Sequence, residues 1–427
     1  MQASADGQVM TKRPSALSLA AVALGNALEF YDFLTFSFFA VQIGHCFFPA
    51  GQAGRGLSLT LATFGVGFLT RPLGGLVIGR LGDRLGRRPA MVVSFSLMGV
   101  AITGLALTPG YAQIGPAAPV LLVAFRLLQG FALGGEIGPS TAYLVEAAPL
   151  HRRGLYVAVQ DTTQYAASLA AGLVGFGLSS ALSPAALDAW GWRCAFLVGA
   201  AVIPIGLVLR RRLPETLAAP GEEGDAAQTA RPPLRLIILG LVMIGSATSC
   251  AYGLDYMTTY AQDSLKLPVS QAFGATIVLG VCGLLASPIA GLLSDRLGRK
   301  PVMISAGAVM AILVIPGFMV MSRLHSAVSV YAVVAVLTVL QEIGSAPAFI
   351  TVTESLPRRI RSGGLALIYA VAVAVCGGVA QFAIKALTDA AKSPLAPAWY
   401  MLGALLVGLT AQALVAESNP LRARRRG

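Results

Sequence analysis

The sequence alternates long apolar runs with short polar segments. Twelve runs stay apolar over about 20 residues, the length that an α-helix needs to cross the hydrocarbon core of a bilayer. Only helices satisfy their own backbone hydrogen bonds in lipid over such segments. The pattern therefore predicts an all-α membrane protein with twelve transmembrane helices. Their expected bounds are 17–41, 58–79, 89–109, 119–146, 155–181, 194–210, 235–260, 271–293, 302–322, 327–353, 364–388 and 397–416.

Composition supports this interpretation. Of the 427 residues, 56% are hydrophobic and only 12% are charged, whereas soluble domains carry about 25% charged residues. The net charge of +12 would suggest a nucleic-acid partner in a soluble protein. In a membrane protein it has a simpler cause, because Lys and Arg collect in cytoplasmic loops. We therefore expect no nucleic-acid partner.

The distribution of Lys and Arg also predicts the orientation. Most of the 31 basic residues fall in the segments that are cytoplasmic if the N-terminus is inside. This bias places both termini in the cytoplasm and requires an even number of helices. The polar start, 1–15, has no cleavage pattern of a removable signal peptide. We expect a monomer that crosses the bacterial inner membrane many times.

Two motifs occur twice. Gly-Arg-Leu-Gly-Asp-Arg-Leu-Gly-Arg-Arg-Pro at 79–89 returns as Leu-Ser-Asp-Arg-Leu-Gly-Arg-Lys-Pro at 293–301. Glu146-Ala-Ala-Pro149 returns as Glu354-Ser-Leu-Pro357 at nearly the same separation. Such repeats indicate an internal duplication, a common transporter design. We predict an N-terminal six-helix bundle (1–210), a cytoplasmic linker (211–234) rich in Ala, Pro, Gly and charge, and a C-terminal six-helix bundle (235–427).

These motifs resemble those of the major facilitator superfamily. The 79–89 segment is similar to its GxLxDRxGRR signature, and Arg126-Leu-Leu-Gln129-Gly130 is similar to its RxxQG signature. Several other segments resemble the metabolite:proton symporter family within it. These are Gly25–Phe33, Arg71-Pro72-Leu73-Gly74, Gly134-Gly135-Glu136, Trp190-Gly191-Trp192-Arg193 and Pro214-Glu215-Thr216.

Within that family the chain most resembles citrate and tricarballylate proton symporters. The short central loop, the Ser-Pro to Trp-Tyr stretch at 393–400, and Tyr256, Thr259 and Tyr260 carry this resemblance. Asp161, Asp255, Gln341, Glu342 and Lys385 depart from it. The resemblance implies a secondary active transporter that symports protons with a small organic carboxylate by alternating access. Its energy source would be the proton gradient, with no cofactor.

Charged residues inside the predicted helices indicate where substrate and protons bind, because a charge in the bilayer is costly without a function or a partner. Asn26, Glu29 and Asp32 share one helical face at steps of three residues, and Arg126, Gln129 and Glu136 lie within one arc of the fourth helix. Arg126 offers the bidentate geometry that a carboxylate requires. For Arg71 a structural role is at least as good an interpretation. The candidate substrate residues are Asn26, Arg126, Gln129, Gln160, Gln164, Tyr256 and Lys385, and the candidate proton-coupling residues are Glu29, Asp32 and Glu136.

The duplicated loop motifs predict a gate, meaning contacts that hold the cytoplasmic end closed in the outward-open state. Their alternative interpretation is ordinary basic loop charge, but the repeated acidic residue argues against it. Asp255, Glu342 and Lys385 form either a buried charge cluster or a further substrate contact. The candidate gating residues are Asp83, Arg84, Arg87, Glu146, Asp295, Arg296 and Glu354.

The sequence leaves alternative functions to compare with this one. A zwitterionic osmolyte such as proline or betaine is the nearest alternative substrate, followed by a dicarboxylate or shikimate. The sequence has no CxxC pair, clustered histidines, nucleophile elbow or phosphate-binding Gly-Lys-Ser/Thr loop, so we expect no metal and no enzyme activity. A sensor with a transporter-like fold would differ by moving no solute in liposomes.

Overall fold

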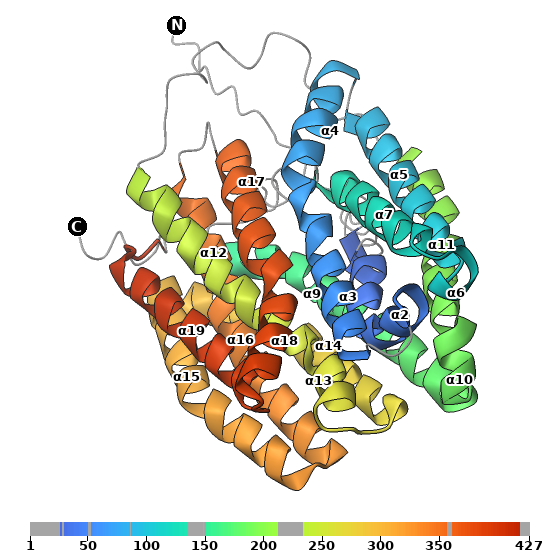
Figure 1. Ribbon diagram of the computed structural model, residues 1–427. Coiled ribbons are helices and arrows are strands. Elements are labelled where there is room, and N and C mark those ends of the chain that lie inside the picture. The colour runs from blue at the N-terminus through green and yellow to red at the C-terminus, as the bar shows by residue number, and fades with distance from the viewer. Residues whose placement is uncertain are drawn as a thin grey trace, which may run out of the picture.

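The computed structural model describes residues 26–27, 30–49, 53–85, 87–134, 148, 151–211, 234–356 and 361–418. All regular structure in these ranges is helical (Figure 1). The prediction of an all-α membrane protein is therefore confirmed. Glu29, Glu136 and Glu146, three of the candidate residues, lie outside the described residues.

The first half of the chain supplies the helices drawn from blue to green in Figure 1. Residues 30–38 are helical and continue into α2 after a turn at Phe39. The elements that follow are α2 (Ala40–Phe47), α3 (Ala53–Leu69), α4 (Arg71–Leu85), α5 (Arg87–Leu107), α6 (Tyr111–Ile114), α7 (Ala117–Leu133), α9 (Arg153–Ala181), α10 (Pro184–Ala186), the π-helical η1 (Leu187–Gly191) and α11 (Trp192–Arg211).

The second half supplies the helices drawn from yellow to red, which gather on the other side of the molecule in Figure 1. They are α12 (Leu234–Asp255), α13 (Met257–Asp263), α14 (Val269–Leu297), α15 (Arg299–Leu324), α16 (Ala327–Ser355), α17 (Arg361–Ala372), the π-helical η4 (Val373–Gly377), α18 (Gly378–Ala391) and α19 (Ala396–Leu414).

The long helices lie close to the predicted spans. Within the described residues, seven helical stretches are long and apolar enough to cross a membrane. Six of these lie in the second half, where α14, α15, α16 and α19 begin and end within a few residues of prediction. The hydrophobic pattern thus locates these helices well.

Four predicted spans contain interruptions that the pattern did not reveal, and the turn at Phe39 is the one in the first span. The second span divides into α3 and α4 at Thr70, directly before Arg71-Pro72. The seventh span divides at Tyr256, and the eleventh contains the π-helical η4. A proline inside a helix removes one backbone hydrogen bond and crowds the preceding turn, which accounts for the break at Thr70. Each break lies on a helix that contributes to the site described below.

The two halves meet along α9 and α14, which run antiparallel. Gly154 near the start of α9 lies against Gly291 near the end of α14, and Gly175 lies against Phe273 at the other end. A side chain built at Gly291 would come within 2.7 Å of the Gly154 carbonyl oxygen. Small residues let transmembrane helices approach closely and gain dispersion contacts. Glycine therefore sets the distance between the halves along this line.

Glycines also hold α3 and α4 against α7 inside the first half. A Cβ atom at Gly130 of α7 would lie 1.6 Å from the carbonyl oxygen of Gly67, and one at Gly74 would lie 1.8 Å from that of Phe131. Gly67 additionally faces the guanidinium of Arg126. This packing brings the start of α4 close to the middle of α7.

We predict that Gly130→Ala destabilises the protein, because the added methyl group would overlap a backbone oxygen that only helix displacement can move. Overpacking of this kind costs about 1–3 kcal/mol or more. The midpoint of thermal unfolding of the purified protein in detergent should fall. The matched control is Gly177→Ala, since no atom lies within 4 Å of that position. Equal midpoints for the two variants would contradict this packing.

Candidate functional site

A cavity of about 140 Å³ lies between the two halves of the chain. One water molecule needs roughly 10–15 Å³ on this scale, so the space suits a small organic molecule with some water. Helix α9 contributes Gln160, Asp161 and Gln164 to its wall. Two of the predicted substrate residues, Gln160 and Gln164, therefore do line a cavity.

The charged groups of this cavity are all acidic. Its wall includes Asp161 from α9, Asp255 from α12 and Glu342 from α16, which we call the acidic cluster. No Lys, Arg or His is among the described residues that line it. Glu342 is only 3% exposed, and its Oε1 atom accepts no hydrogen bond. Their charge within predicted helices marks these three residues in the sequence, but the sequence alone assigns them no role in a site.

Two arginines lie beside the cavity. Arg126 of α7 is 0% exposed, and Arg71 at the start of α4 is also buried. Both guanidinium carbons lie 4.6 Å from the centroid of the Phe33 ring. We call Arg71 and Arg126 the arginine pair. From the sequence alone a structural role for Arg71 is at least as good an interpretation, because only the fold brings it next to Arg126.

The arginine pair has few polar partners. Arg126 donates to the Gln129 side chain and, at 3.3 Å, to the Phe64 carbonyl oxygen. The Nε atoms of both arginines have no hydrogen-bond partner. Neither guanidinium forms an ion pair with a carboxylate in the described part of the chain. Aromatic rings instead cover them, and cation–π contact offsets only part of the cost of burying a charge.

Tyr252 of α12 separates the arginine pair from the cavity. Its ring lines the cavity and packs edge-on against Phe64 at 5.8 Å and Phe68 at 5.4 Å between ring centroids. Phe64 and Phe68 also contact the two guanidinium groups. Arg126 is therefore not among the residues that line the cavity, because an aromatic layer stands between them.

Asn26 and Asp32, two candidate residues of the first helix, contact different neighbouring helices. Asn26 donates to Thr163 at 2.6 Å and to the Gln160 carbonyl oxygen at 3.4 Å. Asp32, 2% exposed, packs against Gly199 of α11, and its Oδ1 atom has no hydrogen-bond partner. Asn26 thus faces α9, whereas Asp32 faces α11 away from the cavity.

Two other predicted substrate residues lie elsewhere. Tyr256 is fully buried in the core of the second half. Lys385 pairs with Asp263 at 3.3 Å and with Asp389 one turn along α18. The structure therefore divides the charge cluster that the sequence suggested, placing Asp255 and Glu342 at the cavity and Lys385 in a separate ion-pair group.

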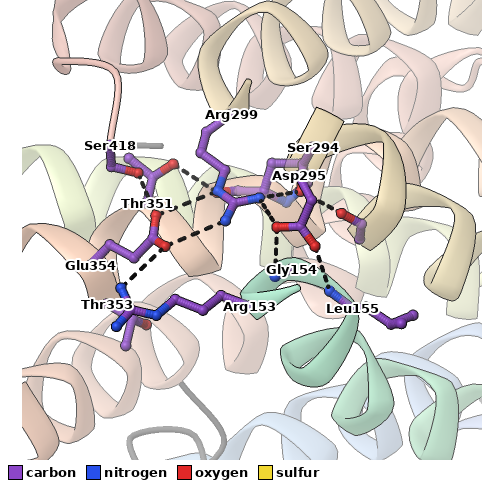
Figure 2. Close-up of polar contacts among 12 residues, drawn as sticks. Arg153, Gly154, Leu155, Ser294, Asp295, Arg299, Thr351, Thr353, Glu354 and Ser418 are labelled. Atoms are coloured by element: carbon purple, nitrogen blue, oxygen red, sulfur yellow. Dashed lines mark hydrogen bonds and ion pairs between the residues drawn. The ribbon is translucent and has the colours of Figure 1, made fainter. Parts of the chain in front are cut away.

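A second polar group joins the halves at the predicted cytoplasmic end, and Figure 2 shows its contacts. Asp295 of α14 accepts hydrogen bonds from the backbone N–H groups of Gly154 (3.0 Å) and Leu155 (3.2 Å) at the start of α9. Arg299 pairs with Asp295 at 2.7 Å and with Glu354 at 3.3 Å. We call Asp295, Arg299 and Glu354 the Asp295 cluster.

The Asp295 cluster contains two of the predicted gating residues and one that was missed. Arg153 of α9 also lies 3.9 Å from Glu354. Arg296, the predicted partner, is exposed, whereas Arg299 is 0% exposed. The repeat placed Asp295 beside Arg296 in sequence, but α14 ends at Leu297, and the turn at Gly298 (φ 95°) brings Arg299, the first residue of α15, back to Asp295. The backbones of Asp83, Arg84 and Arg87 are helical, but their side chains lie outside the description.

Contacts also join the halves beyond the opposite end of the cavity. Gln42 donates to Gln262 at 3.0 Å, and Ser37 pairs with Gln381 at 2.6–2.9 Å. Phe39 packs against Phe273 with ring centroids 4.8 Å apart. Along α14, the contact at Phe273, the cavity and the Asp295 cluster follow one another. The halves thus touch on both sides of the cavity.

An all-helical membrane fold with a polar cavity between two halves, closed by contacts on either side, defines a solute carrier. The family model described as Major Facilitator Superfamily matches residues 22–382, and the chain belongs to this superfamily. It is a multi-pass membrane transporter rather than an enzyme.

Curated relatives extend this likeness over most of the chain. A citrate-proton symporter of Klebsiella pneumoniae is 33% identical over 396 residues, covering 91% of this chain and 89% of the relative. An alpha-ketoglutarate permease of Escherichia coli (strain K12) is also 33% identical, covering 84% of each. A proline/betaine transporter of the same strain is 31% identical, covering 95% of this chain and 84% of the relative.

Solved structures support the fold alone. A D-xylose-proton symporter superposes with a TM-score of 0.76, covering 95% of this chain and 98% of that one, at 18% sequence identity. A partially occluded, inward-open conformation of the xylose transporter XylE from E. coli gives the same TM-score at 93% and 99% coverage. The resemblance to the metabolite:proton symporters found in the sequence motifs is confirmed by the curated relatives.

We predict that Arg299→Ala strongly destabilises the protein, whereas Arg296→Ala does not. Removing Arg299 leaves two buried carboxylates without their main cation, and breaking a buried ion pair in this way costs about 3–5 kcal/mol. Arg296 is exposed in the last turn of α14, three residues before Arg299, and makes a matched control. Thermal unfolding of both variants in detergent tests this. Similar losses from both would mean that Arg299 does not hold the cluster together.

The stability of the protein should depend slightly on pH through the pair of His45 and Asp188. The hydrogen bond to Asp188 (3.0 Å) raises the pKa of His45 above its ordinary value, although partial burial lowers it. A raised folded-state pKa stabilises the fold at pH values below the unfolded value of about 6.5, and this contribution disappears as the pH rises through the raised pKa. His45→Gln should therefore lower the unfolding midpoint at pH 5 but not at pH 9.

The His45 effect should be small, about 0.2–1 kcal/mol, because the pair is exposed. His151→Gln is the control, since His151 is likewise exposed. A loss that is equal at both pH values would show that protonation of His45 plays no part.

Proposed function

We propose that this protein is a proton-coupled symporter of a small organic carboxylate, with citrate or a related tricarboxylate as the leading substrate. The observation that carries this proposal is the arginine pair: two buried guanidinium groups with no described carboxylate partner, one aromatic side chain away from the central cavity. The citrate-proton symporter and the alpha-ketoglutarate permease among the relatives support the same substrate class.

The physical argument is that the two buried guanidinium groups have no counter-ion among the described residues. A buried charge without a counter-ion costs several kcal/mol, and the rings of Phe33, Phe64 and Phe68 offset only part of that. A substrate carboxylate would supply both the negative charge and the missing acceptors for Nε of Arg71 and Arg126. A guanidinium also binds a carboxylate through two parallel hydrogen bonds. The bound anion would thus stabilise a site that is otherwise incomplete.

Tyr252 controls access in this proposal. Because its ring lies between the cavity and the arginine pair, a carboxylate in the cavity reaches Arg126 only after Tyr252 rotates. The break between α12 and α13 directly follows this stretch. Movement of α12 relative to α3 would therefore connect the cavity with the arginines.

The remaining architecture is proposed to follow the superfamily. Twelve transmembrane helices would form two six-helix bundles, 1–210 and 235–427, joined by a cytoplasmic linker at 211–234. The Asp295 cluster would close the cytoplasmic end, and contacts near Gln262 would close the outer end. We place the protein in a bacterial inner membrane with both termini in the cytoplasm, as a monomer driven by the proton gradient.

A zwitterionic osmolyte is the second candidate. The acidic cluster and the aromatic side chains of the cavity favour a cationic group, since quaternary ammonium groups bind aromatic faces. The proline/betaine transporters among the relatives support this alternative. Such a substrate would place its ammonium group at the acidic cluster, whereas citrate has no group of this kind.

We predict that citrate raises the thermal unfolding midpoint of the wild-type protein but not of Arg126→Gln or Arg71→Gln. Each charge-assisted hydrogen bond contributes about 1.5–3 kcal/mol, so either substitution should weaken citrate binding about 10- to 100-fold. Ligand at a hundred times its Kd should stabilise the protein by about 2.7 kcal/mol. Thermal shift with a citrate titration measures all three proteins.

Arg323→Gln serves as the control for lost positive charge, because Arg323 is exposed at the end of α15. It should respond to citrate like the wild type. Stabilisation of the wild type by glycine betaine and not by any di- or tricarboxylate would replace the proposed substrate with the second candidate.

A further inference from the structure

We infer that the acidic cluster of Asp161, Asp255 and Glu342 carries the transported proton, in place of Asp32 of the first helix. This inference rests on the proposed function, because it concerns the same central cavity. It assigns the proton to a group that bridges the two halves of the chain.

The first argument is position. Asp161 belongs to α9 in the first half, whereas Asp255 and Glu342 belong to α12 and α16 in the second half. Asp161 and Glu342 are close enough to interact electrostatically across the cavity. A proton bound between them would be held by both halves at once. Separation of the halves on one side of the cavity would change the surroundings of that proton.

The second argument is that one carboxyl oxygen of Glu342 has no hydrogen-bond partner. This carboxyl group is almost fully enclosed, lines the cavity, and has an oxygen atom, Oε1, that accepts no hydrogen bond. Ser287 of α14 lies beside it but donates its proton to the Ala158 carbonyl oxygen at 3.0 Å. The Tyr165 hydroxyl is a neighbouring donor. An enclosed carboxyl with an open acceptor site can bind a proton and share it with a second carboxylate.

The described residues that line the cavity include no cation that would replace the proton. Lys385, which is buried in the second half, is engaged by Asp263 and Asp389. The arginine pair acts on the cavity only through its tyrosine wall. The titratable or polar groups that face the cluster from the elements around it are Gln160 and Tyr165 of α9, Tyr252 of α12, Ser287 of α14, Gln341 of α16 and Tyr369 of α17.

The third argument explains coupling. A substrate anion entering this cavity meets like charge, which opposes binding as long as the cluster is fully ionised. Binding of a proton removes one negative charge and gives the cluster an O–H donor. The anion would then bind only to the protonated carrier, and both would cross together. Like-charge repulsion thus links the proton to the substrate without direct contact between them.

Asp32 fits this role less well. It is enclosed between the first helix and Gly199 of α11, both in the first half. It lies away from the cavity lining. A proton on Asp32 would sense neither the second half nor a substrate in the cavity.

Infrared spectroscopy of the purified full-length protein tests the inference without any substrate. A neutral carboxyl group absorbs separately from a carboxylate, so a pH titration reports the buried acids that bind a proton. We expect a titrating neutral-carboxyl band in the wild type that is lost or shifted in Glu342→Gln and Asp161→Asn. It should persist in Asp32→Asn and in Asp389→Asn, a matched control outside the cavity. Loss in Asp32→Asn with an unchanged band in both cluster variants would overturn the inference.

Transport in proteoliposomes supplies a second measurement. With labelled citrate, Glu342→Gln and Asp161→Asn should retain exchange across the membrane within about threefold of wild type. Uphill accumulation driven by an imposed pH gradient should fall at least tenfold. If both variants still accumulate citrate like the wild type, the inference is wrong. If the wild type moves no carboxylate, the proposed function fails, and the infrared result still decides the inference.

Discussion

Burial of charge between helices is the constraint on which this structure depends. A transmembrane bundle contains little water, so every ionised side chain needs a counter-ion, a hydrogen-bond network or contact with a cavity. Lys385 and Arg299 meet this requirement with two carboxylates each. The arginine pair has no carboxylate partner among the described residues, and Glu342 borders a cavity whose described lining includes no cation. The difference separates the charges that hold the fold together from those that are left for ligands and protons.

The arginine pair lies on one side of Tyr252, and the acidic cluster lies on the other. Positive charge lies among the aromatic rings of the first half, and negative charge lines the cavity toward the second half. Neither set neutralises the other in this conformation, because a tyrosine ring separates them. Motion of one side chain would thus change the electrostatic environment of any bound solute.

The sequence predicted the helices better than the site. Long apolar runs in the second half located α14, α15, α16 and α19 because nothing but hydrophobicity determines where a straight helix lies in lipid. The breaks at Thr70 and Tyr256 and the π-helical η4 do not change the mean apolarity of their spans, so the pattern could not reveal them. For Thr70 the signal was present, since Arg71-Pro72 follows it.

For the site, sequence spacing identified residue types but not partners. The duplicated motif identified Asp295 and Glu354, yet it selected Arg296 where the turn at Gly298 brings Arg299 to them. Equal steps of three residues placed Asn26 and Asp32 on one face. In the structure Asp32 instead packs against α11, where Gly199 has no side chain to exclude it. Intramembrane charge alone marked Asp161, Asp255 and Glu342. Only the packing of three helices from both halves shows that they share one cavity.

The contact between Asp295 and the first turn of α9 has an evolutionary consequence. One partner is a carboxylate, but the other consists of two backbone N–H groups, which every residue except proline possesses. Substitution in α9 therefore cannot remove the donors, although bulk at Gly154 would collide with Asp295 and Gly291. Selection would thus act on charge at position 295 and on size at position 154. Sequence variation around this one contact should therefore differ between the halves, with charge retained at position 295 and small size retained at position 154.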